Sequence, residues 1–163
     1  MTSVRAHPHT HSVFVGEFER SIDGNGRVAL PASFRDKLGN EILLRLDPRG
    51  SLAITTPERY AEEAAALQAR IDAGTAPFEA LEALGASTSL VTIDKHGRIT
   101  LDDRARAHAN IRPGGNVAFV GTVYGFSIWR PSRYATIKAE RDVVVPVRVW
   151  DDEDDDDDGG GDA

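Results

Sequence analysis

The pattern of apolar and polar positions in the first half of the chain predicts short strands separated by tight turns. Phe14-Val15 begins an apolar segment, and Val28 to Leu30 alternates apolar with small residues, as a strand does. Between them, Asp23-Gly-Asn-Gly26 predicts a turn, because Asp bonds its own backbone and Gly tolerates positive φ. A short helix is expected from Pro31 to Gly39. A hairpin with strands Ile42 to Leu46 and Leu52 to Thr55 follows, around the turn Asp47 to Gly50.

The second half of the chain repeats this pattern. Ser21–Leu30 aligns with Thr92–Leu101 at an offset of 71, and Leu52–Tyr60 aligns with Phe126–Tyr134 at an offset of 74. Three residues are therefore expected to have been gained near Ile111 to Gly115. Two matching blocks in the same order indicate two homologous halves. The second half should contain an apolar segment at Leu90-Val91, a turn at Asp94–Gly97, a strand at Ile99–Leu101, a helix from Asp102 to Asn110, and a hairpin of Val117–Val123 and Phe126–Trp129.

Helices are predicted between and after the halves. Thr56 suits the N-cap of a helix with Pro57 at its first position, and Gly74 suits its end. An apolar stripe recurs along it at helical spacing: Tyr60, Ala64, Leu67 and Ile71. A second short helix is expected at Pro77 to Leu84, and another helix begins at Pro131. Residues 143–149 should be an extended segment or an edge strand, because Pro146 argues against a central strand.

These elements predict a mainly β fold with short helices, of the β+α class. A unit of about 50 residues can hardly bury a core alone, so the two halves should fold on each other. The organisation we expect is a disordered N-terminal arm (1–12), a first repeat with its following helix (13–73), a helical linker (74–86), a second repeat with its following helix (87–140), and an extended segment with a disordered acidic tail (141–163).

Composition changes this picture mainly through charge. The formal net charge is −7, but nine of the 26 acidic residues lie in residues 151–163. Taking them away leaves 17 acidic against 19 basic residues, so the body of the chain is close to neutral. A neutral body permits nucleic-acid binding but does not by itself indicate it. Any basic patch must come from local clustering.

Other features of the composition narrow the function classes. The chain has no Cys, which excludes disulfides, thiolate nucleophiles and Cys-based metal sites. No run approaches the roughly 20 apolar residues that a bilayer span needs, and residues 1–12 lack the apolar stretch of a secretory signal. The five His are scattered, and no carboxylate pair has a recognisable catalytic context. We therefore expect a cytoplasmic protein that is not an enzyme and takes no cofactor, metal or small-molecule substrate.

Three short patterns imitate ligand sites. Gly24-x-Gly26-x-x-Ala29 imitates a dinucleotide fingerprint but is followed by a strand and a Pro instead of a helix. Asp23-Gly-Asn25 imitates the start of a calcium loop, yet Arg27 stands where a ligand belongs. His7, His9 and His11 could hold a metal weakly, but a disordered arm is the favoured interpretation.

The sharpest chemical signal is the motif Asp-x-x-Gly-Arg, which occurs as Asp23 to Arg27 and as Asp94 to Arg98. Asp tightens the turn and Gly permits its backbone conformation. The Arg side chain then projects from the turn, and its guanidinium group can donate two parallel hydrogen bonds to a phosphate or to the edge of a guanine. The plainer interpretation is that the Asp–Arg pair only stabilises the turn and has no role in binding. The duplication of the motif favours the functional interpretation.

The motifs carry a family resemblance. Phe14-Val-Gly-Glu17, Ile22-Asp-Gly-Asn-Gly-Arg27 and Leu30-Pro-Ala-Ser-Phe-Arg35 are similar to the start of MraZ proteins, and Val120-Gly with Phe126-Ser-Ile-Trp129 is similar to their second half. The resemblance covers about residues 13–140. It implies two tandem AbrB/SpoVT-like swapped-hairpin half-units that form a pseudo-two-fold β-barrel with a helical insert.

The resemblance also implies a function. It implies a sequence-specific transcriptional regulator that binds double-stranded DNA as a ring-shaped homo-oligomer. Its sites are direct repeats upstream of the division and cell-wall gene cluster, its own gene included. The protein is then expected at the nucleoid and not at a membrane. The DNA-binding residues implied here are Asp23, Asn25, Arg27, Asp94, Lys95, His96 and Arg98.

Some positions depart from the family pattern. Asn25 stands where the family often has Lys, and the matching second-half position is His96. Asp102, the counterpart of Pro31, adds a negative charge near the second motif. Since each lost positive charge weakens phosphate attraction, we expect weaker DNA binding than in a typical member. The acidic run 151–158 is too charged to fold. It is interpreted as a solubilising tail, with competition against DNA for Arg27 and Arg98 as the alternative.

Two further functions stay open at this point. One is an oligomeric scaffold or partner-binding protein that kept the fold and lost strong DNA binding, which Asn25 and the neutral body allow. The other is an antitoxin-like DNA binder, although such proteins usually need a single half-unit. The salt dependence of DNA binding separates a true binder from a scaffold, because a binder loses affinity steeply as salt rises.

Overall fold

The computed structural model describes residues 13–145, and these form the mainly β structure with short helices that the sequence predicts. The residues of the arm 1–12 and of the acidic tail lie outside this range. The first half contains β1 (Glu17–Ser21), β2 (Arg27–Ala29), α1 (Ala32–Arg35), β3 (Glu41–Leu46) and β4 (Leu52–Thr55). The second half contains β5 (Thr88–Thr92), β6 (Arg98–Thr100), α4 (Asp103–Ala109), β7 (Asn116–Gly121) and β8 (Phe126–Trp129).

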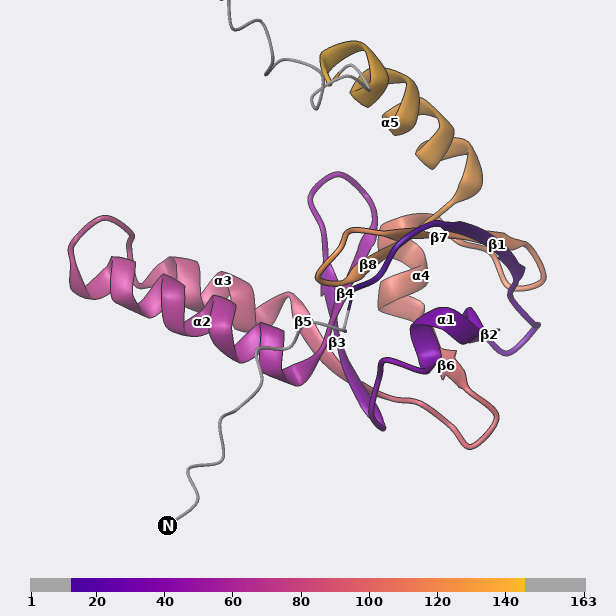
Figure 1. Ribbon diagram of the computed structural model, residues 1–163, viewed down its shortest axis with the longest axis horizontal. Coiled ribbons are helices and arrows are strands. Elements are labelled where there is room, and N and C mark those ends of the chain that lie inside the picture. The colour runs from indigo at the N-terminus through magenta and orange to yellow at the C-terminus, as the bar shows by residue number, and fades with distance from the viewer. Residues whose placement is uncertain (1–12, 146–163) are drawn as a thin grey trace, which may run out of the picture. The chain divides into compact units, whose positions relative to one another are not determined.

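The strands of the two halves exchange partners in a six-stranded antiparallel sheet. Its order is β1-β7-β8-β4-β3-β5, which reads the same from either end once equivalent strands are matched (Figure 1). β1 of the first half pairs with β7 of the second, and β5 of the second half pairs with β3 of the first. In the centre β4 pairs with β8, symmetrically about Ala53 and Ser127. The halves are therefore interleaved, as the pseudo-two-fold expectation requires.

A separate two-stranded ribbon joins β2 to β6. Val28 lies opposite Ile99, and the pairs Arg27 with Thr100 and Ala29 with Arg98 flank it, so the same pseudo-two-fold relation passes through the ribbon. Val28 and Ile99 are each 1% exposed. Because side chains alternate across a strand, the inner face of the ribbon covers the core and its outer face carries the flanking residues.

The core lies between the sheet, the ribbon and the helices α1 and α4. The side of the core next to α1 is aromatic, since the centre of the Phe34 ring lies 4.8 Å from that of Phe126, 5.6 Å from that of Phe14 and 5.3 Å from that of Phe18. Phe34 is 0% exposed, whereas its second-half counterpart is the small Ala105. The core is therefore less symmetric than the backbone.

The structure refines the length difference between the halves. β2 and β6 begin 71 residues apart, β3 and β7 begin 75 apart, and β4 and β8 begin 74 apart. Four residues are thus gained before β7, and the following hairpin loop is one residue shorter. The added residues include Gly114 and Gly115, whose backbone bonds that of Ile22 beside the first turn.

The insert between the halves is a helical hairpin of α2 (Pro57–Asp72) and α3 (Glu79–Ala86), which lie side by side in Figure 1. The Thr56 hydroxyl caps α2 by accepting from the Arg59 amide at 3.2 Å, as predicted. α3 begins two residues later than expected and continues to Ala86, and no side chain caps its start at Phe78. Neither helix has a fully buried residue.

The C-terminal helix α5 (Pro131–Val144) belongs to a second compact unit that starts at Ser132 and is described by itself. Residues 141–144, predicted to be extended, are helical, and this part of the expectation is wrong. The helix formers before them propagate the helix. The rest of the predicted extended segment lies outside the described residues. No helix among residues 13–145 is long and apolar enough to cross a membrane.

Candidate nucleic-acid interface

The first Asp-x-x-Gly-Arg motif forms the turn between β1 and β2. One carboxylate oxygen of Asp23 accepts the amides of Asn25 at 2.8 Å and Arg27 at 2.9 Å. The other oxygen accepts Nε of Arg27 at 3.1 Å. Asp23 therefore holds both the backbone of the turn and the orientation of the arginine.

The second motif has the same geometry. The Asp94 carboxylate accepts the amides of His96 at 2.8 Å and Arg98 at 3.0 Å, and its other oxygen accepts Nε of Arg98 at 3.1 Å. The side chains of Lys95 and His96, like that of Asn25 in the first turn, are exposed at the turn tips. An Asp–Arg pair therefore stabilises both turns. It leaves each arginine side chain about one-third exposed, at 39% for Arg27 and 34% for Arg98.

These contacts lower the pKa values of both aspartates. The pKa of Asp23 lies below its ordinary value of 3.8, chiefly because the Arg27 amide donates to the carboxylate, and Asp94 is lowered in the same way by the Arg98 amide. A lowered pKa means that the contribution to stability is present above the ordinary value and is lost only as pH falls through the lowered one. The carboxylates are therefore ionised, and the turns intact, around neutral pH.

The outer face of the β2–β6 ribbon brings the two arginines together. Arg27 and Arg98 flank the buried Val28–Ile99 pair on the same face, as diagonal neighbours across the ribbon. Such neighbours have Cα atoms roughly 7–8 Å apart. We call this face, with its two turns, the ribbon face. It unites all seven residues singled out in the sequence, three from the first turn and four from the second.

Each guanidinium uses only Nε in its Asp contact. Within residues 13–145, the terminal nitrogens of Arg27 and Arg98 have no hydrogen-bond partner. Carboxylate contact at Nε fixes the plane of the group and leaves the Nη pair available for a bidentate acceptor such as a phosphate or the O6/N7 edge of guanine.

The turn glycines differ in what surrounds them, and this predicts different costs of substitution. Gly26 and Gly97 have φ of +79° and +75°. A Cβ on Gly26 would meet the Arg106 side chain and lie 2.7 Å from the backbone carbonyl oxygen of Leu101, whereas the three atoms nearest to a Cβ on Gly97 all belong to the flexible side chain of Arg35. We expect Gly26→Ala to lower the free energy of unfolding by roughly 2–3 kcal/mol and Gly97→Ala by about 1 kcal/mol.

Urea denaturation measures both values, with Gly24→Ala as a near-neutral control because nothing lies within 4 Å of a Cβ there. Equal losses for Gly26→Ala and Gly97→Ala would show that the Leu101 carbonyl is not the obstacle.

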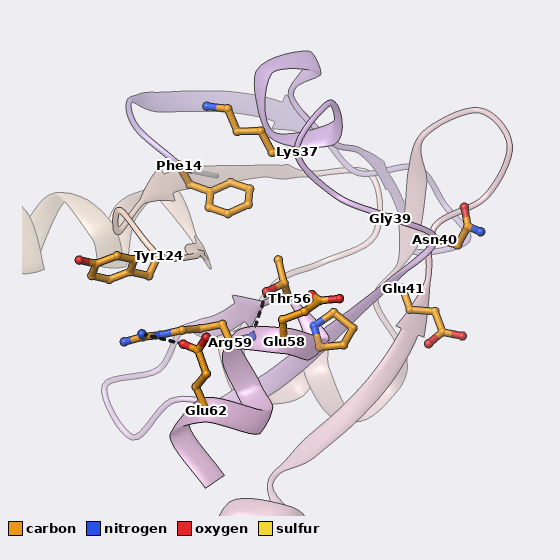
Figure 2. A pocket seen from close by; sticks show the side chains of 11 residues that line it. Phe14, Lys37, Gly39, Asn40, Glu41, Thr56, Glu58, Arg59, Glu62 and Tyr124 are labelled. Atoms are coloured by element: carbon orange, nitrogen blue, oxygen red, sulfur yellow. Dashed lines mark hydrogen bonds and ion pairs between the residues drawn. The ribbon is translucent and has the colours of Figure 1, made fainter. Parts of the chain in front are cut away.

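A cavity of about 640 Å³ lies elsewhere, between the start of α2, the loop before β3 and the tip of the second-half hairpin (Figure 2). None of the ribbon-face residues lines it. Its lining carries both charges, with Lys37 and Arg59 against Glu41, Glu58 and Glu62. The Arg59 guanidinium lies 4.6 Å from the centre of the Tyr124 ring, so this region joins the helical insert to the second half. Among residues 13–145, no group of His, Asp and Glu is arranged to hold a metal ion.

Comparison with known proteins gives the same relationship as the motifs. The chain is 33% identical over 135 residues to the transcriptional regulator MraZ of Azorhizobium caulinodans, covering 78% of this chain and 83% of that protein. It is 31% identical over 118 residues to the transcriptional regulator MraZ of Mycolicibacterium gilvum, covering 72% of this chain and 81% of that protein. It is 30% identical over 132 residues to the transcriptional regulator MraZ of Corynebacterium kroppenstedtii, covering 80% of this chain and 90% of that protein.

No family model matches the sequence. The identities nevertheless extend over most of both chains, and the similar proteins are named as regulators of transcription, not as enzymes. The chain belongs to the MraZ family of transcriptional regulators.

Proposed function

We propose that the ribbon face binds double-stranded DNA and that the protein is a sequence-specific regulator. The observation that carries the proposal is the pair of guanidinium groups, each oriented by a carboxylate at Nε with its Nη nitrogens unpaired among the described residues. β-Ribbons are known readers of DNA grooves, and arginine is the side chain that most often contacts guanine. The structural and the binding interpretations of the motif are therefore compatible, because the Asp–Arg contact that stabilises the turn also orients the guanidinium group that would bind DNA.

The finer proposal is that several copies form a ring that binds direct repeats upstream of the division and cell-wall gene cluster, its own gene included, at the nucleoid in the cytoplasm. Exposed apolar side chains support contacts between copies: Leu90 is 61% and Tyr124 62% exposed. In such a ring, neighbouring copies present ribbon faces to successive repeats, and weak single contacts are summed by multivalency. This compensates for the uncharged Asn25.

The test compares two DNA duplexes, the region upstream of the protein's own gene and a scrambled duplex of equal composition, by mobility shift over a salt series. A regulator that contacts six to ten phosphates loses roughly 10³–10⁵-fold in affinity between about 50 and 200 mM salt and prefers the upstream DNA. Equal, weak and salt-insensitive retention of both duplexes would contradict the proposal and favour a scaffold or partner-binding protein with the same fold.

A further inference from the structure

Each of the helices α1 and α4 places an arginine beside the turn of the opposite half. A Cβ on Gly97 would lie 2.6 Å from Nε and 2.7 Å from Cζ of Arg35, so the Arg35 side chain lies across the second turn. Its pseudo-two-fold counterpart, Arg106, lies against Gly26 in the first turn. Each half thus contributes a guanidinium to the neighbourhood of the other half's motif.

The two arginines differ in their partners. Arg106 donates to the Leu101 carbonyl and pairs with Asp103, and 17% of its side chain is exposed. The position of Asp103 is taken by Ala32 in the first half. Arg35 is exposed, and within residues 13–145 its side chain makes no ion pair or hydrogen bond. One of two equivalent arginines is neutralised, and the other keeps its charge beside the ribbon face.

We propose that Arg35 is a DNA-contacting residue that serves the second turn and binds a backbone phosphate next to the acceptor of Arg98. The inference rests on the proposed DNA binding by the ribbon face. It makes that face asymmetric, because the second turn gathers Lys95, Arg98 and Arg35, whereas the first turn has the uncharged Gly24 and Asn25 at the positions of Lys95 and His96. Arg106 acts on the first turn only as a positioning residue.

A phosphate is the expected acceptor because Arg35 is not held in one plane by a carboxylate, as Arg27 and Arg98 are. A freely oriented cation attracts charge and carries no information about base sequence. Removing Arg35 should therefore weaken binding to every duplex alike, while removing an arginine that reads bases should reduce the preference for the upstream DNA.

The experiment measures affinity and its salt dependence for wild type, Arg35→Gln and the control Arg70→Gln, an exposed arginine on α2 outside the turns and the ribbon. We expect Arg35→Gln to weaken binding of the upstream and scrambled duplexes by a similar factor. It should also reduce the slope of log affinity against log salt by about one. Arg70→Gln should change neither quantity. An Arg35→Gln protein indistinguishable from Arg70→Gln would overturn the inference.

A second variant tests the asymmetry directly. Ala32→Asp places in the first half an acid equivalent to Asp103, which pairs with Arg106 in the second half. Made in the wild-type protein, this substitution should weaken DNA binding much more than when it is made in the Arg35→Gln protein. Equal weakening in both backgrounds would contradict pairing with Arg35. The inference and the proposed function fail differently. If Arg35→Gln has no effect while wild type binds in a salt-dependent way, only the inference is wrong; if wild type itself does not bind, both are overturned.

Discussion

Replacing both Arg27 and Arg98 by alanine is expected to remove specific DNA binding. A well-oriented bidentate contact discriminates by about 1–3 kcal/mol, so the loss of two amounts to roughly 2–6 kcal/mol for each subunit, or about 30- to 10⁴-fold in affinity. In a ring the loss is multiplied, because every subunit loses its contacts together. Fluorescence anisotropy with the labelled upstream duplex measures the effect.

The matched control is the double variant Arg70→Ala/Arg130→Ala, which removes the same charge from two exposed positions outside the turns and the ribbon. Fold should be little affected in the test variant, since both Asp–Arg pairs are partly exposed to solvent, where ion pairs contribute little to stability. A thermal melt close to that of the wild type would verify this. If the two double variants lose affinity equally, DNA is attracted by net charge and the ribbon face does not read it.

Phe34→Ala should be among the most destabilising single substitutions in the described part of the chain. The Phe34 ring is fully buried and lies within 6 Å of the rings of Phe14, Phe18 and Phe126. Truncating such a residue costs roughly 3–5 kcal/mol through lost burial and the cavity that remains. That is a large fraction of the 5–15 kcal/mol typical of a folded domain.

Chemical denaturation of Phe34→Ala, Phe34→Leu and the control Phe78→Ala measures this loss. Phe78 is 57% exposed, so its truncation should cost little, and Phe34→Leu should fall between the two. If Phe34→Ala were no less stable than Phe78→Ala, the aromatic cluster would not be what holds α1 against the sheet, and Arg35 beside it would lack a rigid support.

Local features were predictable from the sequence because their causes are local. The Asp-x-x-Gly turns, the Thr56 cap and the alternation around Val28 and Ile99 are all determined by neighbours within a few residues, and the structure confirms them. The duplication predicted only that the two halves fold on each other, and the pairing of β2 with β6 in one ribbon was not predicted.

Features that depend on distant partners were not predictable in the same way. No periodicity says that β1 pairs with β7 and not with β3 of its own half. The approach of Arg35 to Gly97 arises only when α1 is packed, so no sequence spacing indicates it. The end of α5 was misjudged because a run of Val residues favours a strand until the helix before it propagates through.

The exchange of strands between halves has a consequence for how the chain reaches this structure. Glu17 is paired with Val120 and Glu41 with Thr92, so the sheet is closed by contacts between residues far apart in sequence. Ordering such long intervening segments costs entropy before any strand pairing repays it, and folding is correspondingly slow. Because β1 reaches its sheet partner only after β7 has been made, the sheet is completed late in synthesis on the ribosome, and the two halves acquire their structure together.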